Sequence, residues 1–341
     1  MEREITMKKF KFISALTVLL VTVSIGVCAN AFSDMPGGEM GTALQNAVDA
    51  GLINGVTDDS IAPYDNITRA QMATIITRAF GAVTKSGDIF PDVKDGAWYK
   101  DAVLKAAAMG AFEGDDNNNF NPEKNITFQE TYLVLSRVFG FDTYEARNGA
   151  LVGDCDVTVL DKFADKGEIA QWAVNGAKYI VGNGGWTGID GKLNPTKYIT
   201  RGEFAILMDA LVGVYIDEPG EYKNLGDELI MVRSGGVTID GLKSNHNLVI
   251  TYAVDERGFG ITNSIVNGVM LVLGGADSTP QTVTDVKGRI KTLPDDSYVY
   301  GQGKFYDVRV KAPYIYTNFS DGKVEYYYGV TGTLASLSAN H

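Results

Sequence analysis

The sequence predicts an α + β multidomain protein, in which repeated helical units precede an all-β region at the C-terminal end. Two observations lead to this prediction. The phrase ITRAQMATIITRAFG at 67–81 returns in altered form at 126–140 and 199–213, and its apolar residues recur at helical spacing. From Pro219 onward, short β-branched runs alternate with glycine and asparagine, which is typical of strands joined by turns.

Residues 1–31 have the pattern of a secretory signal peptide. Lysines precede an apolar run, and the small-residue site Ala-Asn-Ala at 29–31 follows it. The run is shorter than the roughly 20 residues that span a bilayer, so we expect cleavage before Phe32 and no membrane contact afterwards. Cys28 leaves lipid modification open as an alternative.

The composition argues against several classes of function. A formal net charge of −12 argues against nucleic acid as a partner, because phosphate binding needs a basic surface. After cleavage Cys155 is the one remaining cysteine, so no internal disulfide can form. The stretch 114–122 alternates acidic and amide residues, but it lacks the glycine and terminal glutamate of an EF-hand loop. We therefore expect neither a metal nor a cofactor.

Each helical unit opens with Phe-x-Asp, and a first helix, a glycine-rich turn and a proline precede the repeated phrase. A short unit with one apolar face is not stable alone, so the three should pack into one module. We expect the units to span 32–82, 88–141 and 163–214, with a connecting segment at 142–162 and a β-rich domain at 220–341.

The repeated phrase contains the start and end signals of a helix. A threonine is followed three residues later by glutamine or glutamate, a capping box that satisfies free amides at a helix start. A glycine then supplies the left-handed closing position. The threonines are Thr68, Thr127 and Thr200, and the glycines are Gly81, Gly140 and Gly213. Core packing accounts for these residues, but not for the arginine that follows the threonine in two copies.

Together these signals resemble three S-layer homology repeats. The resemblance rests on FSD, FPD and FAD, on the tryptophans of the first helices, and on TRAQ, TFQE and TRGE, and it covers about 32–213. It implies a helical bundle with pseudo-threefold symmetry at the cell surface, bound noncovalently to a secondary polysaccharide linked to peptidoglycan. Other surface-layer proteins are a second class of partner that the resemblance suggests.

The resemblance also implies which residues bind the glycan. Arg69 and Arg201 match the arginine of the family motif, whereas Phe128 stands in its place in the second repeat. A guanidinium stays charged and grips a carboxylate with two hydrogen bonds, and the free amides of a helix start also favour anions. The alternative is that each arginine pairs with a neighbouring acid. The groove that relies on position 128 should be weak or silent.

Two further sets of residues are candidates for glycan contact. The aspartates of Phe-x-Asp can bond sugar hydroxyls, but an aspartate there is equally a turn or cap residue. The tryptophans can stack on a sugar face, although an aromatic residue on the first helix is more often part of the core. These candidates are Asp34, Asp92, Asp165, Trp98 and Trp172.

The C-terminal region has a weaker internal repeat. VTIDG at 237–241 resembles GITNS at 260–264, and NLVIT at 247–251 resembles VMLVL at 269–273. A period of roughly 22 residues fits a small parallel β-helix. A β-sandwich is the alternative, with antiparallel strands on either side of 320–322. The tyrosines of this end either form an aromatic sugar platform or pack across a sheet; they are Tyr314, Tyr316, Tyr326, Tyr327 and Tyr328.

The leading hypothesis is a nonenzymatic protein that is anchored to the cell wall and displays its β-rich domain or contributes to a surface layer. A wall-anchored carbohydrate-active enzyme is one alternative, but acids such as Asp240 and Asp277 form no recognisable catalytic pair. A carbohydrate-binding adhesin is the other alternative, with its contacts in the C-terminal domain.

Overall fold

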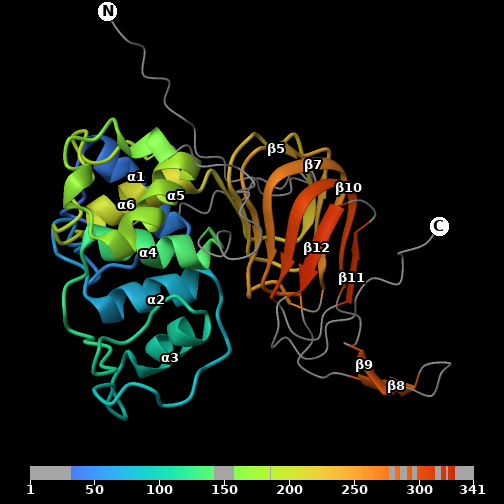
Figure 1. Ribbon diagram of the computed structural model, residues 1–341, viewed down its shortest axis with the longest axis horizontal. Coiled ribbons are helices and arrows are strands. Elements are labelled where there is room, and N and C mark those ends of the chain that lie inside the picture. The colour runs from blue at the N-terminus through green and yellow to red at the C-terminus, as the bar shows by residue number, and fades with distance from the viewer. Residues whose placement is uncertain are drawn as a thin grey trace, which may run out of the picture.

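The computed structural model describes residues 32–141, 157–184, 186–255, 257–275, 281–284, 290–293, 298–311, 316–319 and 322–326. The predicted signal peptide and Cys155 lie outside these ranges, as does most of the predicted connecting segment. Within the described residues, no helix combines the length and the apolar character needed to cross a membrane. Helices and a largely parallel β-sheet lie side by side, so the molecule has a mixed α + β fold (Figure 1).

Among the described residues, each predicted repeat contains two α-helices. They are α1 (Gly38–Asp49) and α2 (Arg69–Ala79), α3 (Lys100–Ala108) and α4 (Phe128–Val138), and α5 (Val174–Gly184) and α6 (Arg201–Leu211). The first helix of each repeat packs against the second helix of another repeat: α1 against α6, α3 against α2, and α5 against α4. The repeats are therefore interlocked rather than strung in a line.

All three predicted capping boxes are present. The hydroxyls of Thr68, Thr127 and Thr200 each accept from the backbone amide three residues later, and the side chain of that residue accepts from the threonine amide. Gly81 and Gly140 adopt the predicted left-handed conformation, with φ of 63° and 72°. The prediction for Gly213 was wrong, because α6 ends in an extended residue and the chain runs directly into a strand.

A ring of backbone hydrogen bonds joins the three repeats just before their second helices. The amide of Ile67 donates to the carbonyl of Ile199, Ile126 donates to Ile67, and Ile199 donates to Ile126, over 3.0, 2.9 and 3.1 Å. All three isoleucine side chains are buried. Because the ring closes on itself, each repeat is held by both of the others.

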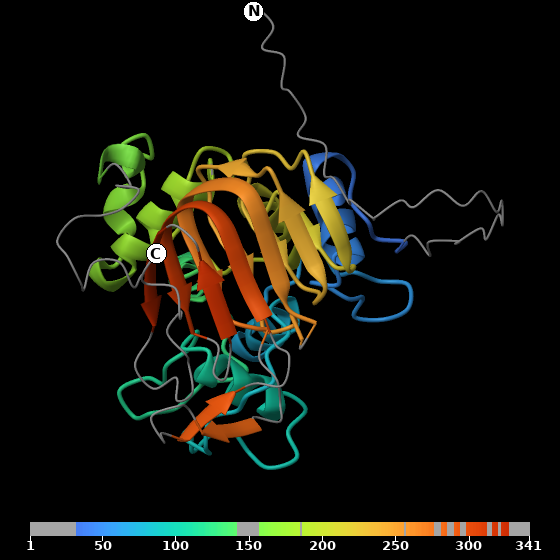
Figure 2. The same ribbon diagram turned by 90° about the vertical axis from the view of Figure 1, so that its right-hand side faces the viewer.

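The sheet follows α6 and is assembled from parallel pairs. Its first strands are β1 (Val214–Ile216), β2 (Gly220–Lys223), β3 (Ile230–Val232), β4 (Val237–Asp240), β5 (Lys243–Ser244) and β6 (Leu248–Ile250). Its later strands are β7 (Phe259–Val272), β10 (Tyr298–Val310), β11 (Tyr316–Phe319) and β12 (Gly322–Tyr326). The sheet is strongly curved, and an antiparallel pair, β8 (Gln281–Thr284) and β9 (Ile290–Leu293), lies away from it (Figure 2).

The pairing confirms one sequence prediction and overturns another. Leu248 pairs with Met270, as the alignment of 247–251 with 269–273 predicts, so this repeat corresponds to one step across the sheet. Val237 pairs with Phe259, one residue before the partner that the alignment of 237–241 with 260–264 gives. The expectation of antiparallel strands around 320–322 was wrong, because β11 and β12 both pair with β10 in parallel. The two short strands meet successive segments of one long strand, which a hairpin cannot do.

Two apolar clusters stabilise the molecule. One fills the inside of the curved sheet with residues such as Ile239, Phe259 and Val308. The other is built mainly from the helices, but it also contains Met231, Val249 and Leu271 from the strands. The helical part and the sheet therefore share a continuous core.

Candidate functional site

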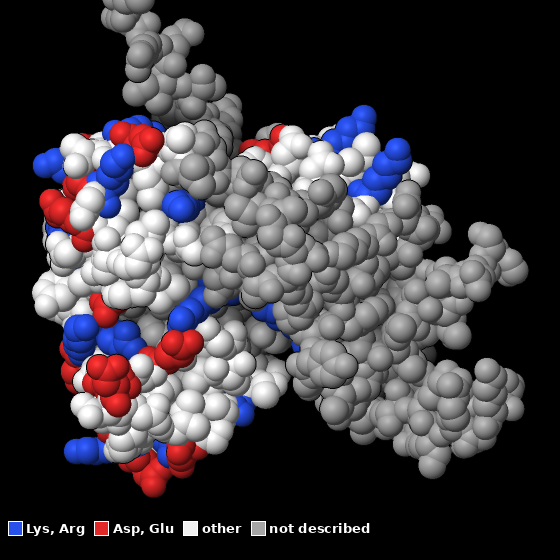
Figure 3. Space-filling view, in the orientation of Figure 1, with Lys and Arg blue, Asp and Glu red and all other residues white. Residues whose placement is uncertain are grey.

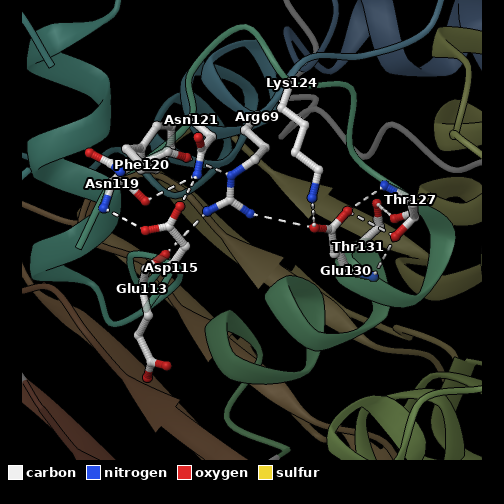
Figure 4. A network of polar contacts seen from close by, with 10 residues as sticks. All are labelled: Arg69, Glu113, Asp115, Asn119, Phe120, Asn121, Lys124, Thr127, Glu130 and Thr131. Carbon is white, nitrogen blue, oxygen red and sulfur yellow. Dashed lines mark hydrogen bonds and ion pairs between the residues drawn. The ribbon is translucent and has the colours of Figure 1, made fainter. Parts of the chain in front are cut away.

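Arg69, the first residue of α2, lies at the junction between the first and second repeats. Its Nε donates to the carbonyl of Phe120 over 2.7 Å, and its Nη2 donates to the carbonyl of Glu113 over 3.1 Å (Figure 4). The guanidinium also lies over the rings of Phe112 and Phe120, 5.2 and 5.0 Å from their centroids. The side chain thus ties its own repeat to the turn of the next one.

The remaining nitrogen of this guanidinium faces an acid. Nη1 of Arg69 lies 3.9 Å from Oε1 of Glu130, which Lys124 contacts at 3.0 Å. Burial lowers the pKa of Arg69, and Glu130 opposes that effect. Burial alone would raise the pKa of Glu130, but hydrogen bonds from Thr127 and Lys124 bring it below its ordinary value. Arg69 and Glu130 are therefore ionised together near neutral pH.

Arg69, Lys124 and Glu130 line a groove of about 550 Å³ that lies where three repeats meet. The first repeat contributes Arg69, the second contributes the turn at 111–116 and one side of α4, and the third contributes Trp172. Arg137 also lines the groove and pairs with Glu113 over 3.1 Å. Acidic and basic side chains are intermixed over the helical part in the view of Figure 3. The groove thus combines three cations, four carboxylates and an aromatic face; the carboxylates are those of Glu113, Asp115, Asp116 and Glu130.

Both candidate tryptophans lie at the surface rather than in the core. Trp172 is 53% exposed and Trp98 is 64% exposed. Trp172 belongs to the short helix at Gln171–Ala173, just before α5, and Trp98 lies just before α3. The expectation that such aromatics are core residues was wrong, since both indole rings are accessible to a ligand.

The three candidate aspartates have structural partners. Oδ1 and Oδ2 of Asp34 accept from the amides of Ile61 and Ala62 over 2.8 and 2.9 Å. Asp92 accepts in the same way from Phe120 and Asn121, and Asp165 from Leu193 and Asn194. Each carboxylate fastens the start of its repeat to the turn before the second helix. A role in sugar binding remains a prediction.

Arg201 forms the matching junction between the third and first repeats. Its Nε donates to the carbonyl of Ile61 over 2.7 Å, and its Nη2 donates to the carbonyl of Asn54. The residue is only 7% exposed, and burial lowers the pKa of its guanidinium. Arg201 is thus held by the same kinds of contact as Arg69, but it is less open to solvent.

The junction between the second and third repeats is closed by aromatic residues. Phe128 is fully buried, and the hydroxyl of Tyr132 donates to the carbonyl of Leu193 over 2.8 Å. The indole Nε1 of Trp186 donates to the same hydroxyl over 3.1 Å. Leu193 occupies the place of Phe120 and Ile61, so a tyrosine hydroxyl replaces the arginine as the donor.

Sequence analysis missed Tyr132 and Trp186 as junction residues. A signal was present, because Tyr132 aligns with Ala73 and Ala205 in the other two repeats. A bulky residue at a position that is otherwise alanine indicates that space has been left by a neighbour, here by the exchange of arginine for Phe128.

The described residues include no cluster of histidine, cysteine and acidic side chains that suits a metal ion. Asp115 instead accepts from backbone amides of its own turn.

The three repeats match a known domain family. The profile of the S-layer homology domain matches residues 31–73, 89–131 and 162–205. The chain is 33% identical to the Surface-layer 125 kDa protein of Lysinibacillus sphaericus over 86% of its own length and 25% of that protein. It is 25% identical to S-layer protein EA1 of Bacillus anthracis over 68% of its length and 27% of that protein.

The chain therefore spans about a quarter of the length of these two relatives. An enzyme is also similar over a shorter stretch: the Amylopullulanase of Thermoanaerobacterium thermosulfurigenes is 32% identical over 47% of this chain and 8% of its own length. Each profile match contains the first helix of one repeat and the capping box that starts its second helix. The chain therefore carries three S-layer homology domains followed by a C-terminal region of β-strands.

Proposed function

We propose that this protein anchors itself noncovalently to the cell wall, and that the groove beside Arg69 binds an acidic secondary polysaccharide attached to peptidoglycan. The S-layer homology domains make it a secreted protein of the cell wall or cell surface. The observation that carries the proposal is the groove itself, in which Arg69, Lys124 and Arg137 lie among acidic side chains and beside an exposed tryptophan.

The contacts of Arg69 indicate how the groove would act. Two of its nitrogens are held by carbonyls, so the side chain is fixed before a ligand arrives and little conformational entropy is lost on binding. An acidic sugar would approach Nη1 and the half-exposed Lys124, and would compete with Glu130 for both. The indole face of Trp172 supplies an apolar surface for a sugar ring.

Repeat order supports a second groove at the Arg201 junction. There α2 takes the place of α4, and Trp98 takes the place of Trp172, because α3 packs on α2 as α5 packs on α4. The third junction should not bind, since Phe128, Tyr132 and Trp186 fill it. We infer two grooves of unequal exposure, with Asp34, Asp92 and Asp165 holding the turns that shape them.

The finer architecture belongs to the same proposal. We infer that the three repeats, at 32–82, 88–141 and 163–214, form a helical bundle with pseudo-threefold symmetry; the closed ring of Ile67, Ile126 and Ile199 supports this. We also infer that 220–341 is a small parallel β-helix, which the parallel pairing of β4 with β7 and of β7 with β10 supports.

We propose that the C-terminal region is structural rather than catalytic. The relatives that match most of the chain are surface-layer proteins, whereas the named enzyme is similar over less than half of it. The tyrosine platform considered above falls on residues whose side chains the structure does not describe. Surface-layer proteins are the second class of partner in this proposal.

The proposal is tested by sedimentation with purified cell-wall sacculi. The full mature chain should pellet with intact sacculi and should stay in solution once the secondary polysaccharide has been removed chemically. A chain that pellets equally with stripped sacculi would show attachment to peptidoglycan or to another component, and one that pellets with neither would overturn the anchoring function.

A further inference from the structure

One face of the sheet packs against the helical part. The strands β1, β3, β6, β7 and β10 align side by side, and their outward residues form a single row. This row consists of Tyr215, Met231, Val249, Leu271 and Arg309, and all five are buried. The first four belong to the helical core cluster, so the row is the surface on which the helices rest.

The last member of the row, Arg309, holds the end of α4. Its Nη1 donates to the carbonyl of Gly140 over 2.8 Å, and the residue is only 2% exposed. The carbonyls at a helix C-terminus carry partial negative charge, which a buried cation stabilises. Leu271 packs directly on Gly140, where an added Cβ would lie 3.3 Å from its side chain. Asn247 also approaches the carbonyl of Phe139, at 3.5 Å.

The same helix forms one wall of the groove. Glu130, Leu133, Val134 and Arg137 of α4 all line it. Arg137 lies less than one helical turn before Gly140. The hydrogen bond from Arg309 and the wall of the groove therefore share the last part of one rigid helix. A shift of the C-terminal end of α4 would move Arg137 and Glu130 relative to Arg69, which belongs to another repeat.

We propose that Arg309 is a positioning residue of the glycan groove, and that the C-terminal sheet is a working part of the anchor rather than a displayed cargo. This inference rests on the function proposed above. The sheet fixes the C-terminal end of α4, and α4 in turn sets where Arg137 and Glu130 lie relative to Arg69 in the groove.

A second contact of the same kind supports the inference. Arg233, which directly follows β3, donates from Nη1 to the carbonyl of Ala50 at the end of α1, over 2.8 Å. Its guanidinium is held by Asp217 at 2.6 Å and lies 4.6 Å from the ring centroid of Tyr215. Two arginines of the C-terminal region thus bind the C-terminal carbonyls of helices from two different repeats.

The test uses the full mature chain carrying Arg309→Met, with Lys223→Met as the matched control. Methionine keeps much of the aliphatic volume and removes the donor, whereas Lys223 is half exposed and pairs with Glu221 on the sheet. Hydrogen exchange is measured by mass spectrometry on peptides covering 128–141, well below the unfolding temperature. We expect the Arg309→Met protein to exchange these amides at least about tenfold faster, because a charge-assisted hydrogen bond is lost.

The affinity for sacculi, measured at the same temperature, provides the readout that a purely stabilising role would not change. We expect Arg309→Met to bind about tenfold more weakly, Arg309→Lys to recover part of the loss, and the control to bind like wild type. Unchanged exchange in 128–141 would overturn the inference, and so would faster exchange with undiminished affinity. If Arg309→Met does not fold, Arg309→Lys is compared with wild type on both readouts.

Failure of the proposed function is distinguishable from failure of this inference. A wild-type chain that does not bind sacculi contradicts the anchoring function and, with it, a role for Arg309 in positioning a glycan groove. A wild-type chain that binds, together with an Arg309→Met variant whose α4 exchange and affinity are unchanged, contradicts only the role of Arg309.

Discussion

At the scale of single residues, the arginines that match the family motif have two tasks. Arg69 and Arg201 each bind two backbone carbonyls of another repeat, so removing either one would loosen a junction as well as a groove. Sequence reasoning proposed these residues for glycan contact, with pairing to a neighbouring acid as the alternative, and that contact stays a prediction. It missed their carbonyl partners, because these lie far away in the chain. Replacing Trp172 is a better test of glycan binding alone, since its side chain is largely exposed and its loss should affect a junction less.

Tyr132 tests how the third junction replaces its arginine. We predict that Tyr132→Phe lowers the free energy of unfolding by about 1–3 kcal/mol, because Trp186 Nε1 and the carbonyl of Leu193 lose their shared partner in a buried site. Urea denaturation of both proteins measures the difference. A loss below about 0.5 kcal/mol would mean that the hydroxyl bridge contributes little.

Restoring the missing arginine should not by itself open the third groove. Phe128 is fully buried beside Tyr132, so Phe128→Arg places a charge where its partner carbonyl is already occupied. We predict a loss of about 3–5 kcal/mol for the single change. The double variant Phe128→Arg/Tyr132→Ala reproduces the pair Arg69 and Ala73, and it should be the more stable of the two. Thermal unfolding of the two variants compares them directly, and an equal or lower stability of the double variant would contradict this view of the junction.

At the scale of secondary-structure elements, the helix starts were the most predictable feature. A capping box depends on residues three positions apart, so Thr68, Thr127 and Thr200 could be recognised from local sequence alone. The end of α6 could not, because Gly213 donates its amide to the carbonyl of Leu229 and leads into a strand. The parallel pairing of β11 and β12 was missed for a similar reason: their common partner, β10, is distant in sequence.

The capping box of α4 should make the stability of the protein depend on pH. The pKa of Glu130 is lowered in the folded state, so its contribution is complete above its ordinary pKa of 4.5 and is lost as the pH falls through the lower folded value. We predict that acidification from neutral pH to about pH 3 destabilises wild type more than Glu130→Gln. Gln71 fills the same position in α2 and does not titrate. Equal acid sensitivity of the two proteins in urea titrations would contradict the prediction.

At the scale of the whole molecule, the shared core predicts that helices and sheet unfold together. All three tryptophans, Trp98, Trp172 and Trp186, lie in the helical part, whereas the strands dominate the C-terminal region. We predict that tryptophan fluorescence and far-ultraviolet circular dichroism give coincident urea transitions. We also predict that residues 32–213 alone are less stable than the intact chain, because they expose the apolar surface that meets Met231, Val249 and Leu271. Two separate transitions would indicate independent domains.

Sequence periodicity predicted the order of the helical repeats and the strands. It did not predict that the helical part packs against the sheet. Arg309 and Gly140 are 169 positions apart in the sequence. No local sequence pattern around either residue predicts their contact. The groove was likewise invisible, because it needs Arg69, Trp172 and α4 from three different repeats. Long-range packing, rather than local propensity, decided both features.

The central claim is that the groove beside Arg69 captures wall polysaccharide. Isothermal titration calorimetry of the full mature chain with the purified polysaccharide tests it most directly, using Trp172→Ala and, as a matched control, Tyr64→Ala, an exposed aromatic residue that does not line the groove. We predict that the first change weakens binding about fivefold or more, as expected for the loss of one stacking contact, and that the second leaves affinity unchanged. Equal affinity of wild type and Trp172→Ala would contradict the account.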